Sequence, residues 1–139
     1  MTILLIVSLT AMCDSAIKQP SPLPHHHHED EHILVSRMPD SDTVRSVAEA
    51  MKQLGDPSRL RIFWLLCHCE ECVINIAAAT GMSSPAVSHH LQLLKKAGLI
   101  VSRRSGKEKY YRAADTAIAD KLHHTIEEIS MISCPEHQT

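Results

Sequence analysis

The chain contains 139 residues, a length that fits one domain with a single modest hydrophobic core. Its net charge of -2 would argue against a nucleic-acid partner if the charge were spread evenly, but it is not. Residues 83–112 contain seven Lys or Arg and one Glu, whereas residues 1–50 contain seven acids against three bases. With one Trp, one Phe and two Tyr, the core must consist mainly of aliphatic side chains, which favours helices.

Residues 1–39 are predicted to form a disordered arm that precedes the domain. The apolar run at residues 3–7 is too short to span a bilayer and follows no positively charged segment, so we expect a cytoplasmic protein without a membrane anchor. The tract HHHHEDEH at residues 25–32 favours a solvated arm, although its imidazoles could also collect Zn²⁺ or Ni²⁺. Translation from Met38 would remove the segment altogether.

The domain is predicted to span residues 40–133, with a short tail at residues 134–139. Its first helix should be capped by the stretch Asp40-Ser41-Asp42 and run to about Leu54. Apolar residues recur along it at helical spacing, which indicates one apolar face. That stripe comprises Val44, Val47, Met51 and Leu54.

Two further helices are expected before the basic segment. Asp56 can cap the first of them, and Pro57 suits its first position because that residue needs no amide hydrogen. This helix is nearly all apolar, so it should lie at the centre of the core. The next helix is expected over residues 73–80 and should end at Gly81.

The basic segment begins with a helix that has one apolar and one polar face. Ser84 is expected to cap it, with Pro85 in the first turn, and Gly98 should end it. The apolar face comprises Val87, Leu91 and Leu94. A short helix, a turn and a second helix with a polar face are the pattern of a helix-turn-helix.

A two-stranded hairpin is predicted to follow. It starts at residues 99–101, turns at Ser105 and Gly106, and returns through Tyr110 and Tyr111. The expected fold is therefore mainly α (α+β winged helix-turn-helix), with about five helices and a two-stranded β-hairpin wing.

Such a unit would present one surface to DNA. Serine and glutamine side chains on the second helix could hydrogen-bond base edges, whereas the Lys and Arg side chains would contact phosphates. The candidates are Ser83, Ser84, Ala86, Ser88, His89, His90, Gln92, Lys95, Lys96, Arg103, Arg104, Lys107 and Lys109.

The cysteines suggest metal or redox chemistry rather than a disulfide framework, because their number is odd and three lie close together. Cys69 and Cys72 have the C-x-x-C spacing that lets two sulfurs reach one ion. Cys67 adds a third thiol nearby, and His68 an imidazole. Cys67 could alternatively be a small buried hydrophobe at the end of its helix.

The segments LGDPSRLRIFWLL, ECVINIA and MSSPAVSHHLQLLKKAGLIVSRRSGKEKYY resemble, in this order, the ArsR/SmtB family of metal-sensing transcriptional repressors. The likeness covers residues 44–132. It implies a homodimer that binds double-stranded operator DNA when metal-free and leaves it when a metal binds. The dimer would form through the first and last helices, here about residues 42–54 and 116–132.

The effector sites that the resemblance implies are matched only in part. The family's thiolate site resembles E-L-C-V-C-D-L, in which Cys72 fits the first thiolate and Ile74 replaces the second. The family's site on the last helix keeps Asp115. Its other three positions fall on Ala117, Glu128 and Met131.

The remaining donors could still bind an effector. Zn²⁺, Cd²⁺, Pb²⁺ or arsenite would suit Cys67, Cys69 and Cys72, and Cys134 could add a further thiolate from the tail. His123 with Glu127, and His124 with Glu128, stand at i,i+4 and could chelate an ion across the dimer. They could equally be solvated polar residues.

Other functions fit less of the chain. The same fold could sense thiol oxidation, or have no metal effector. A metal chaperone that uses the His-rich arm would leave the wing unexplained. An enzyme is not expected, because the sequence has no Gly-rich phosphate loop, nucleophile elbow or HExxH helix.

Overall fold

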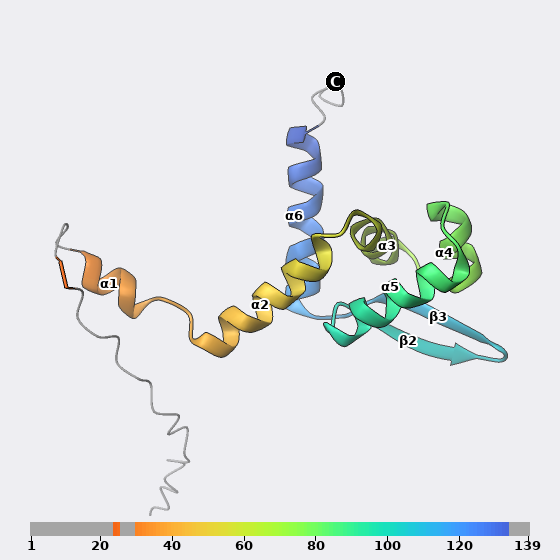
Figure 1. Ribbon diagram of the computed structural model, residues 1–139, viewed down its shortest axis with the longest axis horizontal. Coiled ribbons are helices and arrows are strands. Elements are labelled where there is room, and N and C mark those ends of the chain that lie inside the picture. Colours follow the sequence, from red (N-terminus) through yellow and green to blue (C-terminus); the bar gives the residue numbers. More distant parts are fainter. Residues whose placement is uncertain (1–23, 26–29, 134–139) are drawn as a thin grey trace, which may run out of the picture. The chain divides into compact units, whose positions relative to one another are not determined.

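The computed structural model describes residues 24–25 and 30–133, and it divides into two units, Met1–Pro39 and Asp40–Thr139 (Figure 1). Most of the His-rich tract and Cys134 lie outside the described residues. The described part of the first unit contains α1 (Glu31–Ser36), a six-residue helix that the sequence analysis did not predict. The described residues of the second unit form five helices, α2 to α6, as predicted, and α1 is a sixth.

The first two helices of the second unit begin at the caps expected from the sequence. In α2 (Ser41–Leu54), the Asp40 carboxylate accepts hydrogen bonds from the amides of Asp42 and Thr43. In α3 (Pro57–His68), the Asp56 carboxylate accepts a hydrogen bond from the Arg59 amide at 2.9 Å. Each carboxylate satisfies amides that have no partner within the helix.

The helix-turn-helix consists of α4 (Val73–Thr80) and α5 (Ser84–Lys96). Gly81 has φ 69°, a left-handed conformation that glycine adopts without steric cost, and it ends α4 as predicted. The cap of α5 is Ser83, so the prediction of Ser84 was wrong. Ser83 has the extended backbone that a cap requires, and its hydroxyl accepts a hydrogen bond from the Ala86 amide at 3.3 Å.

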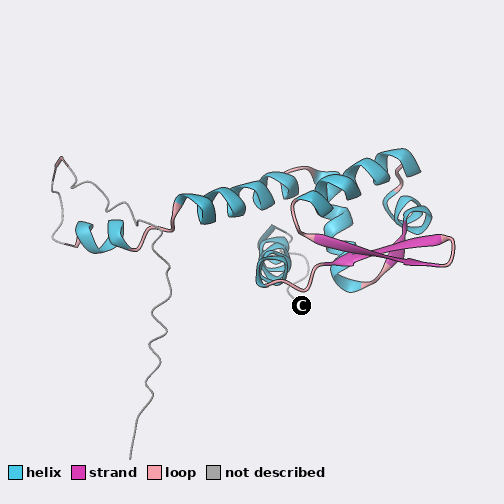
Figure 2. Ribbon diagram, turned by 90° about the horizontal axis from the view of Figure 1, so that it is seen from below, coloured by secondary structure: helices cyan, strands magenta, loops and turns pink. Residues whose placement is uncertain are grey.

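The predicted two-stranded hairpin is confirmed, and a short third strand joins it to make a three-stranded antiparallel sheet. Its strands are β1 (Glu71–Cys72), β2 (Ile100–Ser105) and β3 (Glu108–Ala113), in the order β1-β3-β2. β1 joins the segment after α3 to the wing, because Glu71 pairs with Tyr111 and Cys72 with Tyr110. The tip of the β2–β3 hairpin extends past the helices (Figure 2).

The core is aliphatic, as the composition predicted, apart from Phe63. Its central element is α3, which packs against α2, α4, α5, β3 and α6 (Ala117–Ser133). The largest fully buried side chains are Phe63, Ile62, Leu66, Ile76, Leu91, Leu94, Leu99, Ile100 and Val87.

The apolar stripe of α2 is only partly covered within one chain. Val44 and Met51 are 49% and 58% exposed, and Ile129 on α6 is 56% exposed. Met51 and Ile129 both line an apolar groove between α2 and α6. Among the described helices, none is long and apolar enough to cross a membrane.

Candidate nucleic-acid interface and metal-ligand group

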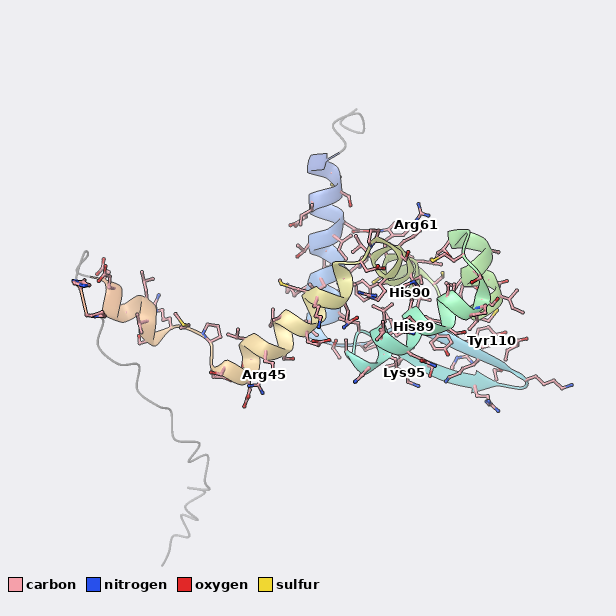
Figure 3. The ribbon with its side chains drawn as sticks, in the orientation of Figure 1. Arg45, Arg61, His89, His90, Lys95 and Tyr110 are labelled. Atoms are coloured by element: carbon pink, nitrogen blue, oxygen red, sulfur yellow. The ribbon has the colours of Figure 1, made fainter. Side chains whose placement is uncertain are left out.

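The polar face of α5 is open to solvent over most of its length. Of the nine candidate base- or phosphate-contacting residues on α5 and at its cap, six are exposed: Ser83, Ser84, His89, Gln92, Lys95 and Lys96. Ala86, Ser88 and His90 are half-buried. Figure 3 labels His89, His90 and Lys95 along α5, with Tyr110 on the adjacent wing. The exposed side chains give α5 a surface that could enter a groove of DNA.

His90 is directed into the protein rather than along this surface. Its Nδ1 atom is buried and has no hydrogen-bond partner within the described residues. The pKa of Asp56 is lowered mainly by the Arg59 amide, and His90 contributes to the same effect. His90 therefore packs near the start of α3.

The wing adds cations beside α5. The Lys95 ammonium donates a hydrogen bond to the Ser102 hydroxyl at 2.7 Å, which joins α5 to β2. Lys109 lies over the Tyr111 ring at 5.5 Å. Arg104 and Lys107 are exposed near the hairpin tip.

Arg103 is held by a carboxylate, as is Arg112 of β3, which pairs with Asp115 at 2.8 Å. The Arg103 Nε donates to Glu70 Oε1 at 2.7 Å, and its guanidinium lies 5.1 Å from the centre of the Tyr110 ring. The hydrogen bond from Arg103 lowers the pKa of Glu70. Arg103 thus links the wing to the α3–β1 connection, a role that its place in a basic run did not indicate.

The metal site expected at the three clustered thiols stays a prediction. Three donors that hold one ion must bring their ligand atoms close together. Among the described residues, one group has its three ligand atoms within 4.8 Å of one another, and it does not include Cys67, Cys69 or Cys72. The physical reason is that the chain leaves the helix at Cys69, which has extended backbone, and enters β1 at Cys72. The C-x-x-C spacing therefore does not fall on one helical turn, where residues three apart share a face.

The thiols also differ in environment. Cys67 is half-buried, and burial, followed by the charges of Glu127 and Asp120, raises its pKa to about 11. Cys69 is exposed, and its thiol donates to the Leu65 carbonyl at 3.4 Å. Because the thiolate is the reactive form, this environment lowers the reactivity of the free Cys67 thiol.

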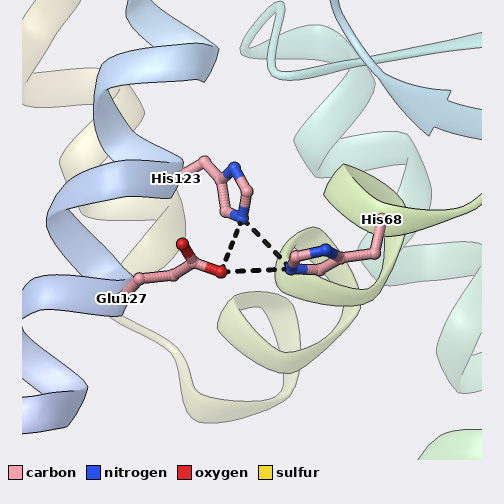
Figure 4. A group of neighbouring side chains, drawn as sticks. All are labelled: His68, His123 and Glu127. Carbon is pink, nitrogen blue, oxygen red and sulfur yellow. Dashed lines mark hydrogen bonds and ion pairs between the residues drawn. The ribbon is translucent and has the colours of Figure 1, made fainter.

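A different group of donors does converge, at the end of α3 and on α6 (Figure 4). Within the described residues, one group of three side chains has its ligand atoms within 4.8 Å of one another. It consists of His68, His123 and Glu127. The two Nε2 atoms lie 3.1 Å apart, and Glu127 Oε1 lies 3.1 Å from His123 Nε2 and 3.3 Å from His68 Nε2. The i,i+4 spacing had indicated the pair His123–Glu127, but not the approach of His68.

In the other pair that the i,i+4 spacing indicated, His124 and Glu128, the imidazole has a different partner. The His124 Nε2 atom lies 3.4 Å from the Asp120 Oδ1 atom, one turn earlier on α6. A cavity of about 530 Å³ adjoins the group, and its lining includes His68, His123, Cys67 and Asp120. The cavity gives small ions and water access to the two imidazoles.

The fold defines a class: a winged helix-turn-helix regulator, in which a recognition helix stands beside a basic wing. The model for "Bacterial regulatory protein, arsR family" matches residues 56–102. The "Transcriptional repressor SmtB homolog" of Synechocystis sp. is 42% identical over 77 residues, 55% of this chain and 58% of that protein. The "Cadmium resistance transcriptional regulatory protein CadC" of Listeria innocua is 41% identical over 86 residues, 60% of this chain and 71% of that protein.

A solved structure agrees with these relatives. It is the homodimeric winged helix-turn-helix DNA-binding domain of a possible ArsR-family regulator from Mycobacterium bovis. It has a TM-score of 0.63 and 32% identity, and the match covers 75% of this chain and 97% of that one. The chain therefore belongs to the arsR family of bacterial regulatory proteins, which confirms the resemblance seen in the sequence. The family consists of transcriptional regulators rather than enzymes.

Proposed function

We propose that this chain is a transcriptional repressor that binds double-stranded operator DNA as a homodimer and is released by a metal ion. The observation that carries the DNA-binding part is the continuous exposed face of α5 and the wing. Ser83 and Gln92 can meet base edges, and the surrounding Lys and Arg side chains can meet phosphates.

The dimer is proposed to form through α2 and α6. Large apolar side chains on both helices are half or more exposed in the single chain, and burying them would stabilise an assembly. The related M. bovis domain is described as homodimeric. Two copies would present two α5 helices to half-sites about one DNA turn apart, roughly 34–36 Å.

A metal effector is supported by two independent observations. The Listeria relative is named for cadmium resistance, and this chain brings two imidazoles and a carboxylate to one point. Arsenite, which prefers several thiolates, is less well supported because the three clustered cysteines do not converge. A divalent ion such as Zn²⁺ is therefore the proposed effector.

DNA binding can be tested without knowing the operator. The reduced, metal-free chain is used to select duplexes from a random-sequence library, and the affinity for an enriched duplex is compared with that for a scrambled one. We expect an enriched inverted repeat and a preference of at least about 10³-fold at physiological salt. Equal affinity for enriched and scrambled duplexes would contradict the proposal.

A further inference from the structure

We propose that His68, His123 and Glu127 form a Zn²⁺ site within one subunit, which joins the end of α3 to α6. The binding site itself follows from the geometry of this chain. Its regulatory effect rests on the function proposed above.

The spacing of the three donor atoms suits a tetrahedral ion. With bonds of about 2.0–2.1 Å, two ligand atoms of a tetrahedral Zn²⁺ lie about 3.3–3.4 Å apart. The three separations here are 3.1, 3.1 and 3.3 Å. An ion could therefore bind all three atoms with shifts of a few tenths of an ångström, and leave a fourth position for water.

An ordinary ion pair explains the arrangement less completely. One protonated imidazole would be enough to neutralise Glu127, yet both imidazoles direct Nε2 at the same oxygen and at each other (Figure 4). Two imidazoles that both carried a proton on Nε2 would repel at 3.1 Å. A cation satisfies all three atoms at once, because neutral imidazole and carboxylate both offer it lone pairs.

The site is also held in place and accessible. The His68 ring packs against the Trp64 ring at 4.4 Å and against the His123 ring at 4.7 Å, which limits its orientations. Side chains of His68 and Glu127 are 42% and 40% exposed, whereas that of His123 is 18% exposed. The imidazole and carboxylate donors favour a borderline ion such as Zn²⁺ over a soft ion that prefers thiolates.

The chain that follows His68 connects the metal site to the DNA-binding surface. His68 is the last residue of α3, and Glu70, two residues later, holds Arg103 of the wing. A metal that fixes His68 to α6 would constrain the α3–β1 connection and, through Glu70, the wing. This linkage would couple metal binding to DNA affinity.

The site is tested in the full chain after His25, His26, His27 and His28 are all changed to Ser, so that the tract does not compete for metal. Co²⁺ is titrated as a spectroscopic substitute for Zn²⁺, and Zn²⁺ affinity is then measured by competition. We expect one Co²⁺ per chain, with visible bands of tetrahedral coordination and no thiolate-to-cobalt charge transfer.

His68→Ala and Glu127→Gln should each weaken Zn²⁺ binding by at least about 100-fold, since loss of even an outer-shell partner costs 10–100-fold. His124→Ala and Glu128→Gln, which alter the adjacent residues on α6, are the matched controls and should change it less than threefold. Retained DNA binding without metal shows that each variant is folded.

Unchanged Zn²⁺ affinity in both ligand variants would overturn the site, and so would an equal loss of Zn²⁺ affinity in the two controls. A loss of Zn²⁺ affinity only when Cys67, Cys69 and Cys72 are changed to Ser would also overturn it. Tight Zn²⁺ binding that depends on His68 but leaves DNA affinity unchanged would support the site and contradict its regulatory effect. The experiment can therefore contradict the binding site and its regulatory effect independently of each other.

Discussion

Glu70, between α3 and β1, holds Arg103 of the wing although the two residues are 33 positions apart in the sequence. The pair connects the end of α3, where His68 lies, with the strand β2 that leads to the hairpin tip. A change at the end of α3 can therefore alter how a wing cation is presented to DNA.

Glu70→Gln should release Arg103 for contact with a phosphate. We expect the metal-free protein to bind its duplex more tightly, and the dependence of log K on log salt to steepen by about 0.9 per protomer. The free energy of unfolding should change little, because the pair lies at the surface, where solvent screens it. Affinity measured over a series of salt concentrations checks this, with Glu71→Gln as control. An unchanged slope would contradict the assigned role of the pair.

Lys107→Gln, near the wing tip, should weaken binding to all duplexes alike. A phosphate contact carries no sequence information, so the ratio of enriched to scrambled duplex affinity should stay the same. The salt slope should fall by about 0.9 per protomer. Lys121→Gln on α6 is the control, and an equal effect there would show that general charge, rather than the wing, determines affinity.

Met51→Asp should dissociate the proposed dimer without unfolding the chain, because Met51 is 58% exposed in the single chain. Each buried polar group without a partner costs about 1–3 kcal/mol, and more when charged, so the dimer should weaken by at least about 10-fold. Sedimentation equilibrium measures this. Lys52→Asp is the control: Lys52 is the next residue and does not line the groove, so this variant should remain a dimer. An equal dimer dissociation constant in the two variants would exclude this interface.

Ser83→Ala should lower the free energy of unfolding by about 0.5–2 kcal/mol, because the amides at the start of α5 lose their cap. Ser84→Ala should have a smaller effect, since Ser84 is the first residue of the helix rather than its cap. Chemical denaturation of the two variants, each compared with the unchanged chain, checks the difference. The reverse order would favour the cap predicted from sequence.

Local signals predicted much of the fold. Asp40 and Asp56 cap helices where expected, and α4 has the predicted bounds because Gly81 ends it in a left-handed conformation. β1 was missed because two residues are too few to show periodicity, and it forms only by pairing with β3. The cap of α5 was misplaced by one residue because two serines stand side by side.

The candidate sites depended more on tertiary structure. The exposed face of α5 follows from helical spacing, so most of its candidates lie where expected. The thiol site stays a prediction, and sequence proximity of Cys69 and Cys72 did not account for the change from helix to strand between them. The approach of His68 to His123, 55 positions away, has no local signal and follows only from the packing of α3 against α6.

The central claim is that metal controls DNA binding by this chain. Fluorescence anisotropy of an enriched, labelled duplex with the reduced full chain, titrated with Zn²⁺ at constant ionic strength, tests it directly. We predict tight binding without metal and a fall in affinity of about 5–150-fold on saturation with Zn²⁺, the usual range of coupling between two sites. Affinity that stays the same from the metal-free to the Zn²⁺-saturated protein would contradict it.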